Sequence, residues 1–280
     1  MHPPPEPQSL RTAPARAGAG AFDDVAATLR EEVLAHCERH GIELEGRAGW
    51  NTLETNSGFV ERRGAPLVAM ATERLGTASL EGMRIADLGC GFGALSAYFA
   101  FQGAGVTGID INRGRLEVGR RVAERHGLEV ELAKGAMEAP RLAEESFDLV
   151  VMNNSLCYLA EPGLQLRALR AALRLVTPGG AIVIRNPNRL HPVDQFTEIP
   201  FLSLLPPADA VRVAARLGRR RSLCRLTSPR TARRELLEAG FSEVVQHRGA
   251  NRGLLRPAPL ARYSHFTALR PVAAGAGVGG

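Results

Sequence analysis

The sequence contains few lysine, cysteine or aromatic residues. Its 280 residues include a single lysine, Lys134, one tryptophan, four cysteines and only 5% aromatic side chains. The cysteines are far apart and form no CxxC pair or cysteine–histidine cluster: they are Cys37, Cys90, Cys157 and Cys224. We therefore expect small buried thiols, and neither a disulfide framework nor a zinc site.

Long apolar runs are missing as well. The strongest candidate for a membrane span, residues 199–205, is far shorter than the roughly 20 residues that cross a bilayer. Pro206 and Pro207 follow it. The first 20 residues are rich in Pro, Ala and Gly and lack the hydrophobic region of a signal peptide. We expect a cytoplasmic protein whose ends, residues 1–20 and 271–280, are disordered tails.

Acidic residues are scarce in the C-terminal third. Residues 185–270 contain 16 basic and 6 acidic side chains, against 19 and 23 elsewhere, and the net charge is +6. No aromatic residues alternate with these arginines, so nucleic acid is not an expected partner. A helix predicted at residues 208–221 places Val211, Ala214 and Leu217 on one face and arginines on the other. It can be a lid helix with a solvated arginine face, or a peripheral contact with an anionic membrane.

From residue 83 onward, short apolar runs alternate with segments of helical period. Strands are predicted at residues 83–88, 105–110, 128–132, 147–152, 181–185, 243–248 and 263–269. Helices are predicted at residues 94–101, 112–126, 163–176 and 229–239. This alternation is typical of an α/β fold, here a Rossmann-like, doubly wound, mostly parallel seven-stranded sheet with helices on both faces.

The remaining segments complete the domain plan. One helix is expected at residues 22–40, and a second begins near Pro66 and ends at Gly76. After the fifth strand the alternation stops, and a proline-rich segment forms an inserted lid. The expected parts are an N-terminal helical cap at 21–80, a cofactor-binding core at 81–187, a lid at 188–228 and the rest of the core at 229–270.

A glycine-rich turn follows the first predicted strand. It reads Asp87-Leu88-Gly89-Cys90-Gly91-Phe92-Gly93, and glycines let the backbone approach a ligand closely. Gly89, Gly91 and Ala94 also satisfy a dinucleotide fingerprint. Asp110, at the end of the next strand, can accept both hydrogen bonds of a ribose diol. The glycine-rich turn and Asp110 together fit several nucleoside cofactors, NAD among them.

The ordered set of motifs resembles class I S-adenosylmethionine-dependent methyltransferases, over residues 83–188 and 229–269. The matching motifs lie at residues 85–93, 106–110, 146–151, 173–180 and 239–241. The resemblance implies S-adenosylmethionine as cofactor, with Asp87 and the glycine loop at its methionine end and Asp110 at its ribose. The implied cofactor contacts are Asp87, Gly89, Cys90, Gly91, Gly93, Asp110, Ile111, Ala136, Met137 and Asn153.

The sequence departs from this family at one contact. Ala136 stands where an acid beside the adenine amino group is often found. Met137 would then contact the adenine, or Glu138 would do so if the motif is aligned in a shifted register. Arg62 or Arg63 can pair with the carboxylate of the cofactor, and the segment 50–59 is expected to close the pocket.

Methyl transfer is an in-line displacement, so positioning of the acceptor is the main task of the enzyme. His191 and Asp194 follow the fifth strand and can act as a general base, which slightly favours an oxygen acceptor. Asn154 and Tyr158 are candidate substrate contacts, or cap the turn after the fourth strand. No metal is expected, because asparagines stand where clustered carboxylates would be needed.

The expected acceptor is a small molecule, such as a sugar, a polyketide-like compound or another secondary metabolite. Because the domain resembles quinone O-methyltransferases, a membrane-associated lipid or quinone is an alternative acceptor. An NAD(P)-dependent oxidoreductase would need a hydride site such as a Tyr/Lys pair, and Lys134 lacks such a partner. A non-catalytic cofactor-binding protein is a further alternative. His265, inside a late strand, is expected to be a satisfied core residue.

Overall fold

We analysed a computed structural model of the chain, which describes residues 20–42, 44, 53–161, 163–247 and 260–272. Its centre is a seven-stranded sheet with the strand order β3-β2-β1-β4-β5-β7-β6. The strands are β1 (Arg84–Leu88), β2 (Gly105–Asp110), β3 (Val130–Lys134), β4 (Phe147–Asn153), β5 (Val176–Pro187), β6 (Ser242–His247) and β7 (Tyr263–Leu269). β1 to β5 pair in parallel and β7 is antiparallel to both of its neighbours, which confirms the predicted fold class.

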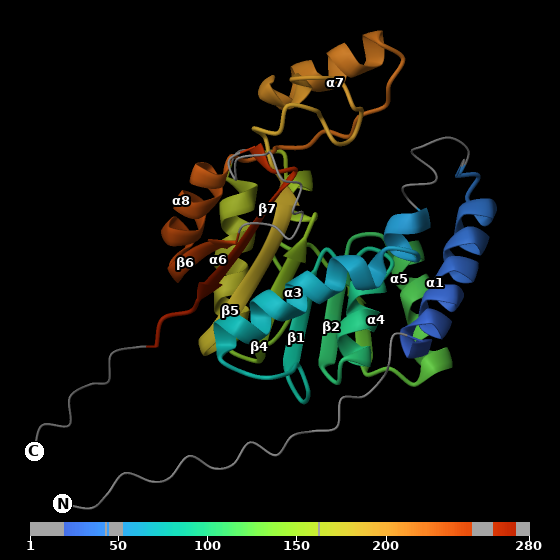
Figure 1. The fold of residues 1–280 in the computed structure, drawn as a ribbon, viewed down its shortest axis with the longest axis vertical. Coiled ribbons are helices and arrows are strands. Elements are labelled where there is room, and N and C mark those ends of the chain that lie inside the picture. The colour runs from blue at the N-terminus through green and yellow to red at the C-terminus, as the bar shows by residue number, and fades with distance from the viewer. Residues whose placement is uncertain (1–19, 43, 45–52, 162, 248–259, 273–280) are drawn as a thin grey trace, which may run out of the picture.

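Helices cover both faces of the sheet (Figure 1). One face packs against α3 (Val60–Leu75), α4 (Ala94–Phe101) and α5 (Arg113–His126), and α1 (Gly20–Arg39) packs on α4 and α5. The other packs against α6 (Leu164–Leu175) and α8 (Pro229–Ala239). Along β1, Ile85 and Asp87 face the first layer, whereas Ala86 and Leu88 face the second, because side chains alternate along a strand.

Several elements differ from the sequence prediction in their bounds, α3, β3 and β5 among them, and β5 begins at Val176 instead of residue 181. α3 begins at Val60, six residues before Pro66, because Val60 and Gly64 continue the buried stripe of the helix. A Cβ on Gly64 would lie 2.2 Å from the ring of Tyr98, so glycine allows α3 to approach α4. β3 begins at Val130, two residues later than predicted, since the Leu128 amide bonds to Ala123 O and ends α5.

The inserted lid stands beyond the ends of β4 and β5 and contains η2 (Leu202–Leu204) and α7 (Pro207–Arg216) (Figure 1). α7 is shorter than the predicted helix at 208–221, because Gly218 takes a left-handed φ of +68°. Leu202, Ala210 and Ala214 form a small apolar core of the lid. None of the helices in the described part of the chain has both the length and the apolar character that a membrane crossing requires.

A buried ion pair joins the two ends of the lid. Asp194 is fully buried, and its Oδ2 lies 3.1 Å from Nη2 of Arg221, whose side chain is 2% exposed. The carboxylate also accepts hydrogen bonds from Ser203 Oγ, Thr197 Oγ1 and the amides of Phe196 and Thr197. Burial raises the pKa of Asp194, but the hydrogen bonds from Ser203 and Thr197 and the charge of Arg221 hold it below its usual range. The pair therefore stabilises the lid at neutral pH and weakens only in strong acid.

Two arginines of the lid form ion pairs that differ in burial: Arg221 in a buried pair and Arg212 in an exposed one. Asp194→Ala leaves Arg221 buried without its partner and is expected to cost about 3 to 5 kcal/mol of lid stability. Asp209→Ala is the matched control, because its pair with Arg212 at 3.0 Å is exposed and contributes at most about 1 kcal/mol. Trypsin should cut the lid of the first variant much faster than that of the control. Equal cleavage rates would contradict the structural role of Asp194.

Candidate active site

The glycine turn connects β1 to α4 at the carboxyl edge of the sheet. Gly89 and Gly91 have φ values of +80° and +61°, in the left-handed region that other residues rarely adopt. The amides of Gly89 and Cys90 both donate to Ile109 O of β2, at 2.8 and 3.0 Å, which fixes the turn against the neighbouring strand. Within the described residues no side chain caps the N-terminus of α4, so the amides of its first turn lack a side-chain acceptor.

Asp110 ends β2 beside this turn. Its Oδ2 accepts the Gly91 amide at 3.0 Å and its Oδ1 accepts the Asn112 amide at 2.8 Å. Each carboxylate oxygen can accept a further hydrogen bond. The next side chain, Ile111, is 71% exposed, which is unusual for a large aliphatic residue. The structure thus brings a fixed carboxylate, an exposed apolar side chain and the glycine turn together, as the sequence predicted.

Asp87 lies below the glycine turn and is almost fully buried. Ser96 Oγ of α4 donates to its Oδ2 at 2.7 Å. Burial, and then the negative charge of Asp110, raise the pKa of Asp87 to about 6, although Ser96 and Arg63 act in the opposite direction. The carboxylate is therefore poised to gain from a cationic group bound in the turn.

Arg63 of α3 and Arg62 behave differently. Arg63 reaches inward: it donates to Thr55 O, and its Nε is buried without a partner. Burial and the charge of Arg185 lower the pKa of Arg63 to about 10, so it stays charged at neutral pH. Arg62 is exposed and lies over the ring of Phe59 at 5.3 Å. Of the two predicted partners for a cofactor carboxylate, Arg63 is therefore the one that faces the site.

The turn after β3 carries the two predicted adenine contacts. Ala136 and Met137 are half-buried, and a Cβ on Gly89 would lie 2.9 Å from the Met137 methyl group. Met137 therefore lies against the glycine turn. Glu138 is half-buried in the same turn. Of the predicted closing segment, residues 50–59, the structure describes residues 53–59, and Leu53 lies in one apolar cluster with Phe92 of the glycine turn.

The end of β4 completes this edge. Asn153 Oδ1 accepts from Arg185 Nη1 at 3.3 Å. Asn154 has a left-handed φ of +54°, and its amide donates to Arg185 O at 2.6 Å. Asn154 Oδ1 and Ser155 Oγ are buried and have no hydrogen-bond partner among the described residues. A non-glycine residue in this conformation, beside unsatisfied polar atoms, is typical of a ligand site.

Sequence reasoning missed two residues at the same edge. Arg185 ends the apolar run of β5, and its guanidinium lies 3.5 Å from the ring centroid of Tyr263, on β7. The sequence signal for Arg185 was a charged residue directly after four apolar residues. Its contact with Tyr263 could not be predicted in this way, because Tyr263 is far away in the sequence. His265, which pairs with Arg185 across β5 and β7, has its Nδ1 buried without a partner. It is therefore not the satisfied core residue that we expected.

The predicted pairing of His191 with Asp194 is wrong. Asp194 is committed to Arg221, Ser203 and Thr197, and within the described residues no hydrogen bond joins it to His191. His191 is buried, and its Nδ1 lies 2.6 Å from Val193 O in its own loop. Asp194 is a structural residue of the lid, whereas a role for His191 as general base stays a prediction.

Tyr158 is half-exposed and connects the site to the lid. It follows β4 in η1 (Leu156–Tyr158), and its ring centroid lies 6.4 Å from that of Phe196. Behind it, Cys157 packs against Cys224 and Leu226 of the lid, so two of the four widely spaced cysteines are in one cluster. Within the described ranges, no three His, Cys, Asp or Glu side chains gather as metal ligands would.

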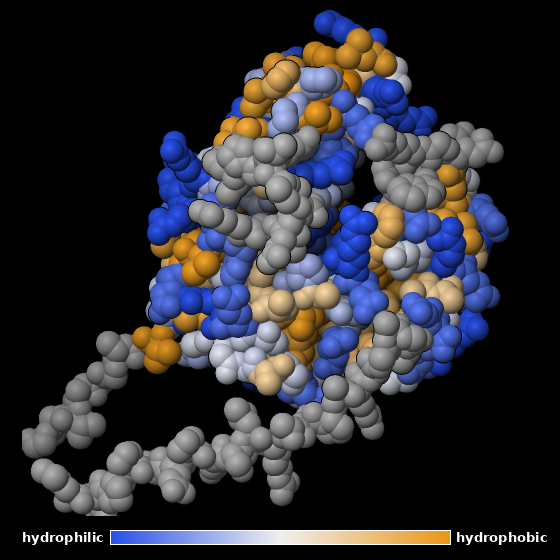
Figure 2. Space-filling model, viewed as in Figure 1, coloured by the Kyte–Doolittle hydropathy of each residue, from blue (hydrophilic) through white to orange (hydrophobic). Residues whose placement is uncertain are grey.

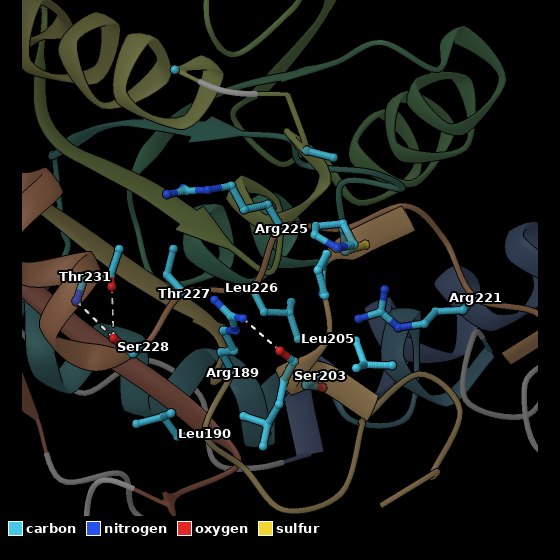
Figure 3. Close-up of a pocket in the computed structure, with 16 residues that line it drawn as sticks. Arg189, Leu190, Ser203, Leu205, Arg221, Arg225, Leu226, Thr227, Ser228 and Thr231 are labelled. Atoms are coloured by element: carbon cyan, nitrogen blue, oxygen red, sulfur yellow. Dashed lines mark hydrogen bonds between the residues drawn. The ribbon is translucent and has the colours of Figure 1, made fainter. Parts of the chain in front are cut away.

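A cleft of about 870 Å³ lies between the lid and the starts of α6 and α8 (Figure 3). Its lining is partly apolar, with Leu190, Leu205 and Leu226, and partly cationic, with Arg189 and Arg225. Among the described residues that line it, none comes from the glycine turn or β2. The cleft is therefore separate from the cofactor contacts, on the other side of β5.

Comparison with known proteins gives consistent matches. Residues 85–180 match the family described as Methyltransferase domain. The ubiquinone biosynthesis O-methyltransferase of Ruegeria pomeroyi is 40% identical over 108 residues, which are 39% of this chain and 42% of that protein. That of Alkalilimnicola ehrlichii is 40% identical over 113 residues, or 39% and 44% of the two chains. The chain thus spans less than half the length of these curated relatives.

Solved structures share the fold at low identity. An S-adenosylmethionine-dependent methyltransferase from Mesorhizobium loti aligns with a TM-score of 0.53 and 21% identity, over 81% of this chain and 100% of that one. The [4+2]-cyclase SpnF aligns with a TM-score of 0.50 and 19% identity, over 74% and 80%. One fold therefore carries more than one named reaction. The sheet order and the ordered motifs agree with the match of residues 85–180 to the family described as Methyltransferase domain.

Proposed function

We propose that the chain binds S-adenosylmethionine at the glycine turn and transfers its methyl group to an oxygen of a small-molecule acceptor. The observation that carries this proposal is the carboxylate of Asp110, fixed beside the turn by two backbone amides. The oxygen is favoured because the curated relatives are named O-methyltransferases.

The residues present fit this cofactor. Gly89 and Gly91 give a turn without side chains, Asp110 offers acceptors to a ribose, and Ile111 and Met137 offer apolar contact to a base. Asp87 would accept from the ammonium group and Arg63 would pair with the carboxylate at the methionine end. The family's acid at the adenine is replaced by Ala136, so apolar contact and backbone groups would hold the ring.

Methyl transfer needs little from the protein beyond alignment of the cofactor and the acceptor. When bound, the cofactor supplies a methyl group on a positively charged sulfur; the acceptor oxygen bonds to this carbon as the carbon–sulfur bond breaks, and the hydroxyl proton leaves to a base. Asn153 and Asn154 end β4, next to β1, and would line the acceptor side of this reaction. Holding the two reactants in line lowers the barrier by removing the entropy cost of their encounter.

The first experiment is calorimetric titration with S-adenosylhomocysteine beside NAD and NADP. The wild type should bind only S-adenosylhomocysteine, and Asp110→Asn should weaken that binding at least tenfold, about 1.4 kcal/mol. Asp148→Asn is the matched control: its carboxylate also accepts a backbone amide, Arg84 N at 2.9 Å, but at the opposite edge of the sheet. Binding of a nicotinamide cofactor instead would favour the oxidoreductase alternative, and binding without methyl transfer to any phenol or alcohol would favour a non-catalytic protein.

The pKa of Asp87 gives a pH prediction. Because the pKa is raised to about 6, the unliganded protein takes up a proton on Asp87 as the pH falls from 7.5 to 5. A bound ammonium favours the carboxylate form, so the affinity for S-adenosylhomocysteine should fall about tenfold over this range. The neighbouring charges of Asp110 and Arg63 change the position of the transition but not its sign.

Asp87→Asn provides the control for this measurement. Its affinity should be weak and independent of pH between 5 and 7.5, because the titrating carboxyl is gone. A pH dependence that is the same in both proteins would place the titrating group elsewhere.

The exposed residues of the lid favour a second candidate, an acceptor held at a membrane. Phe201 and Leu217 are 62% and 60% exposed, beside the exposed Arg212 and Arg216 of α7. Figure 2 shows hydrophobic and strongly hydrophilic residues side by side over this part of the molecule. An apolar surface flanked by arginines suits the interface of an anionic bilayer.

Sedimentation with lipid vesicles tests this second candidate. The protein should bind vesicles that contain phosphatidylglycerol, less strongly at high salt, and should not bind pure phosphatidylcholine. Changing Phe201 and Leu217 together to serine should lower binding, whereas Leu237→Ser, an exposed leucine on α8, should not. If both variants bind as the wild type does, the lid is not the membrane contact.

A further inference from the structure

Arg185 is a mostly buried cation without an acidic partner. Within the described part of the chain, no carboxylate lies within ion-pair distance of its guanidinium. Its contacts are the ring of Tyr263, at 3.5 Å from the centroid, and Asn153 Oδ1, at 3.3 Å from Nη1. Both contacts are neutral: Asn153 Oδ1 accepts one of the five N–H groups of the side chain, and Tyr263 also acts on the guanidinium through a side-chain hydrogen bond. Burial of an arginine without a counter-charge costs free energy unless a ligand supplies the charge.

The neighbours of Arg185 add to this cost. Burial lowers the pKa of Arg185, and the charges of Arg262 and Arg62 lower it further, although Tyr263 acts in the opposite direction. Arg63, from α3, is a second inward-facing cation, and Arg185 lowers its pKa in turn. Arginines from α3, β5 and the start of β7 therefore gather around one edge of the sheet, which makes that edge a site for anions.

Polar atoms around Arg185 also lack partners. Among the described residues, Asn154 Oδ1 and His265 Nδ1 are buried with no hydrogen-bond partner. Asn154 follows the residue that pairs with Arg185 across β4 and β5, and His265 pairs with Arg185 across β5 and β7. Burial, and then the charge of Arg185, lower the pKa of His265 to about 4, so the imidazole is neutral at pH 7. Such unsatisfied groups are rare in folded proteins away from ligand sites.

We propose that Arg185 binds an anionic group of the methyl acceptor, so that the enzyme acts on a molecule that carries a carboxylate or a phosphate near the methylated oxygen. This inference rests on the proposed function. The strand order places β4 between β1, which ends in the glycine turn, and β5, which ends near Arg185. The acceptor would therefore lie over the end of β4, between the cofactor on one side and the guanidinium on the other. A planar guanidinium suits either anion because it can donate two parallel hydrogen bonds.

The cofactor's own carboxylate is assigned to Arg63 and not to Arg185. Asp87 is among the charges that act on Arg63, whereas those that act on Arg185 are Tyr263, Arg262 and Arg62. Arg185 and Arg63 are neighbouring inward cations, since the charge of Arg185 acts on Arg63, and two such cations suit two anions, one from each reactant.

The test titrates the protein with benzoate and with phenyl phosphate, with and without saturating S-adenosylhomocysteine. Uncharged benzamide is the ligand control. Wild type should bind at least one of the two anions and not benzamide, and the preferred anion identifies the class of acceptor. Arg185→Gln should weaken this binding by roughly tenfold to a hundredfold, the effect of losing a hydrogen-bonded charge, and leave S-adenosylhomocysteine binding unchanged. Arg185→Lys keeps the charge but loses the planar guanidinium, so its affinity for the anion should lie between those of the wild type and Arg185→Gln.

Arg84→Gln is the matched protein control, because this arginine belongs to β1 at the opposite edge of the sheet. It should bind the anions as the wild type does. Thermal unfolding separates ligand binding from a structural role: without ligands, Arg185→Gln should melt no lower than the wild type, because it removes an unpaired buried charge. A lower melting temperature together with unchanged anion binding would assign Arg185 to the structure.

Other results would overturn the proposal in distinguishable ways. If no anion binds to the wild type at the highest soluble concentration, Arg185 is not an anion site. If Arg185→Gln weakens S-adenosylhomocysteine but not benzoate, the arginine belongs to the cofactor site. If the wild type binds anions but not S-adenosylhomocysteine, the proposed function fails while the anion site remains.

Discussion

The parallel pairing of β1, β2, β4 and β5 is the constraint on which the rest of this site depends. Parallel strands all end at one edge, so the residues that follow them meet there whatever their separation in the sequence. Asp87, Asp110, Asn153 and Arg185 each lie at or near the end of a different strand of this set. The glycine turn and the chemistry of the candidate site are consequences of that arrangement.

The features that the sequence predicted correctly are local. β2 and α4 match their predicted bounds because one apolar run and one helical period define each of them. The position of Asp110 beside the glycine turn was expected because it follows a strand directly, and its partners there are backbone groups, the amides of Gly91 and Asn112. Its role at a cofactor ribose stays a prediction.

The features that the sequence did not reveal depend on contacts between distant side chains. Asp194 was paired with His191 because they are three residues apart, whereas its partner Arg221 is 27 residues away and on the far end of the lid. Tyr263 meets Arg185, and Cys157 meets Cys224, only because β7 and the lid fold back over β4 and β5.

Two buried charges in this molecule have opposite surroundings, and the contrast separates structure from function. Asp194 accepts hydrogen bonds at both oxygens and faces a buried cation. These contacts within the protein offset the free-energy cost of burying its charge. Arg185 has a ring and an amide oxygen, repelling cations nearby, and unsatisfied polar neighbours. A fold selected for stability alone would replace such an arginine by an apolar residue. Its presence at the carboxyl edge therefore argues that its missing partner arrives with the substrate.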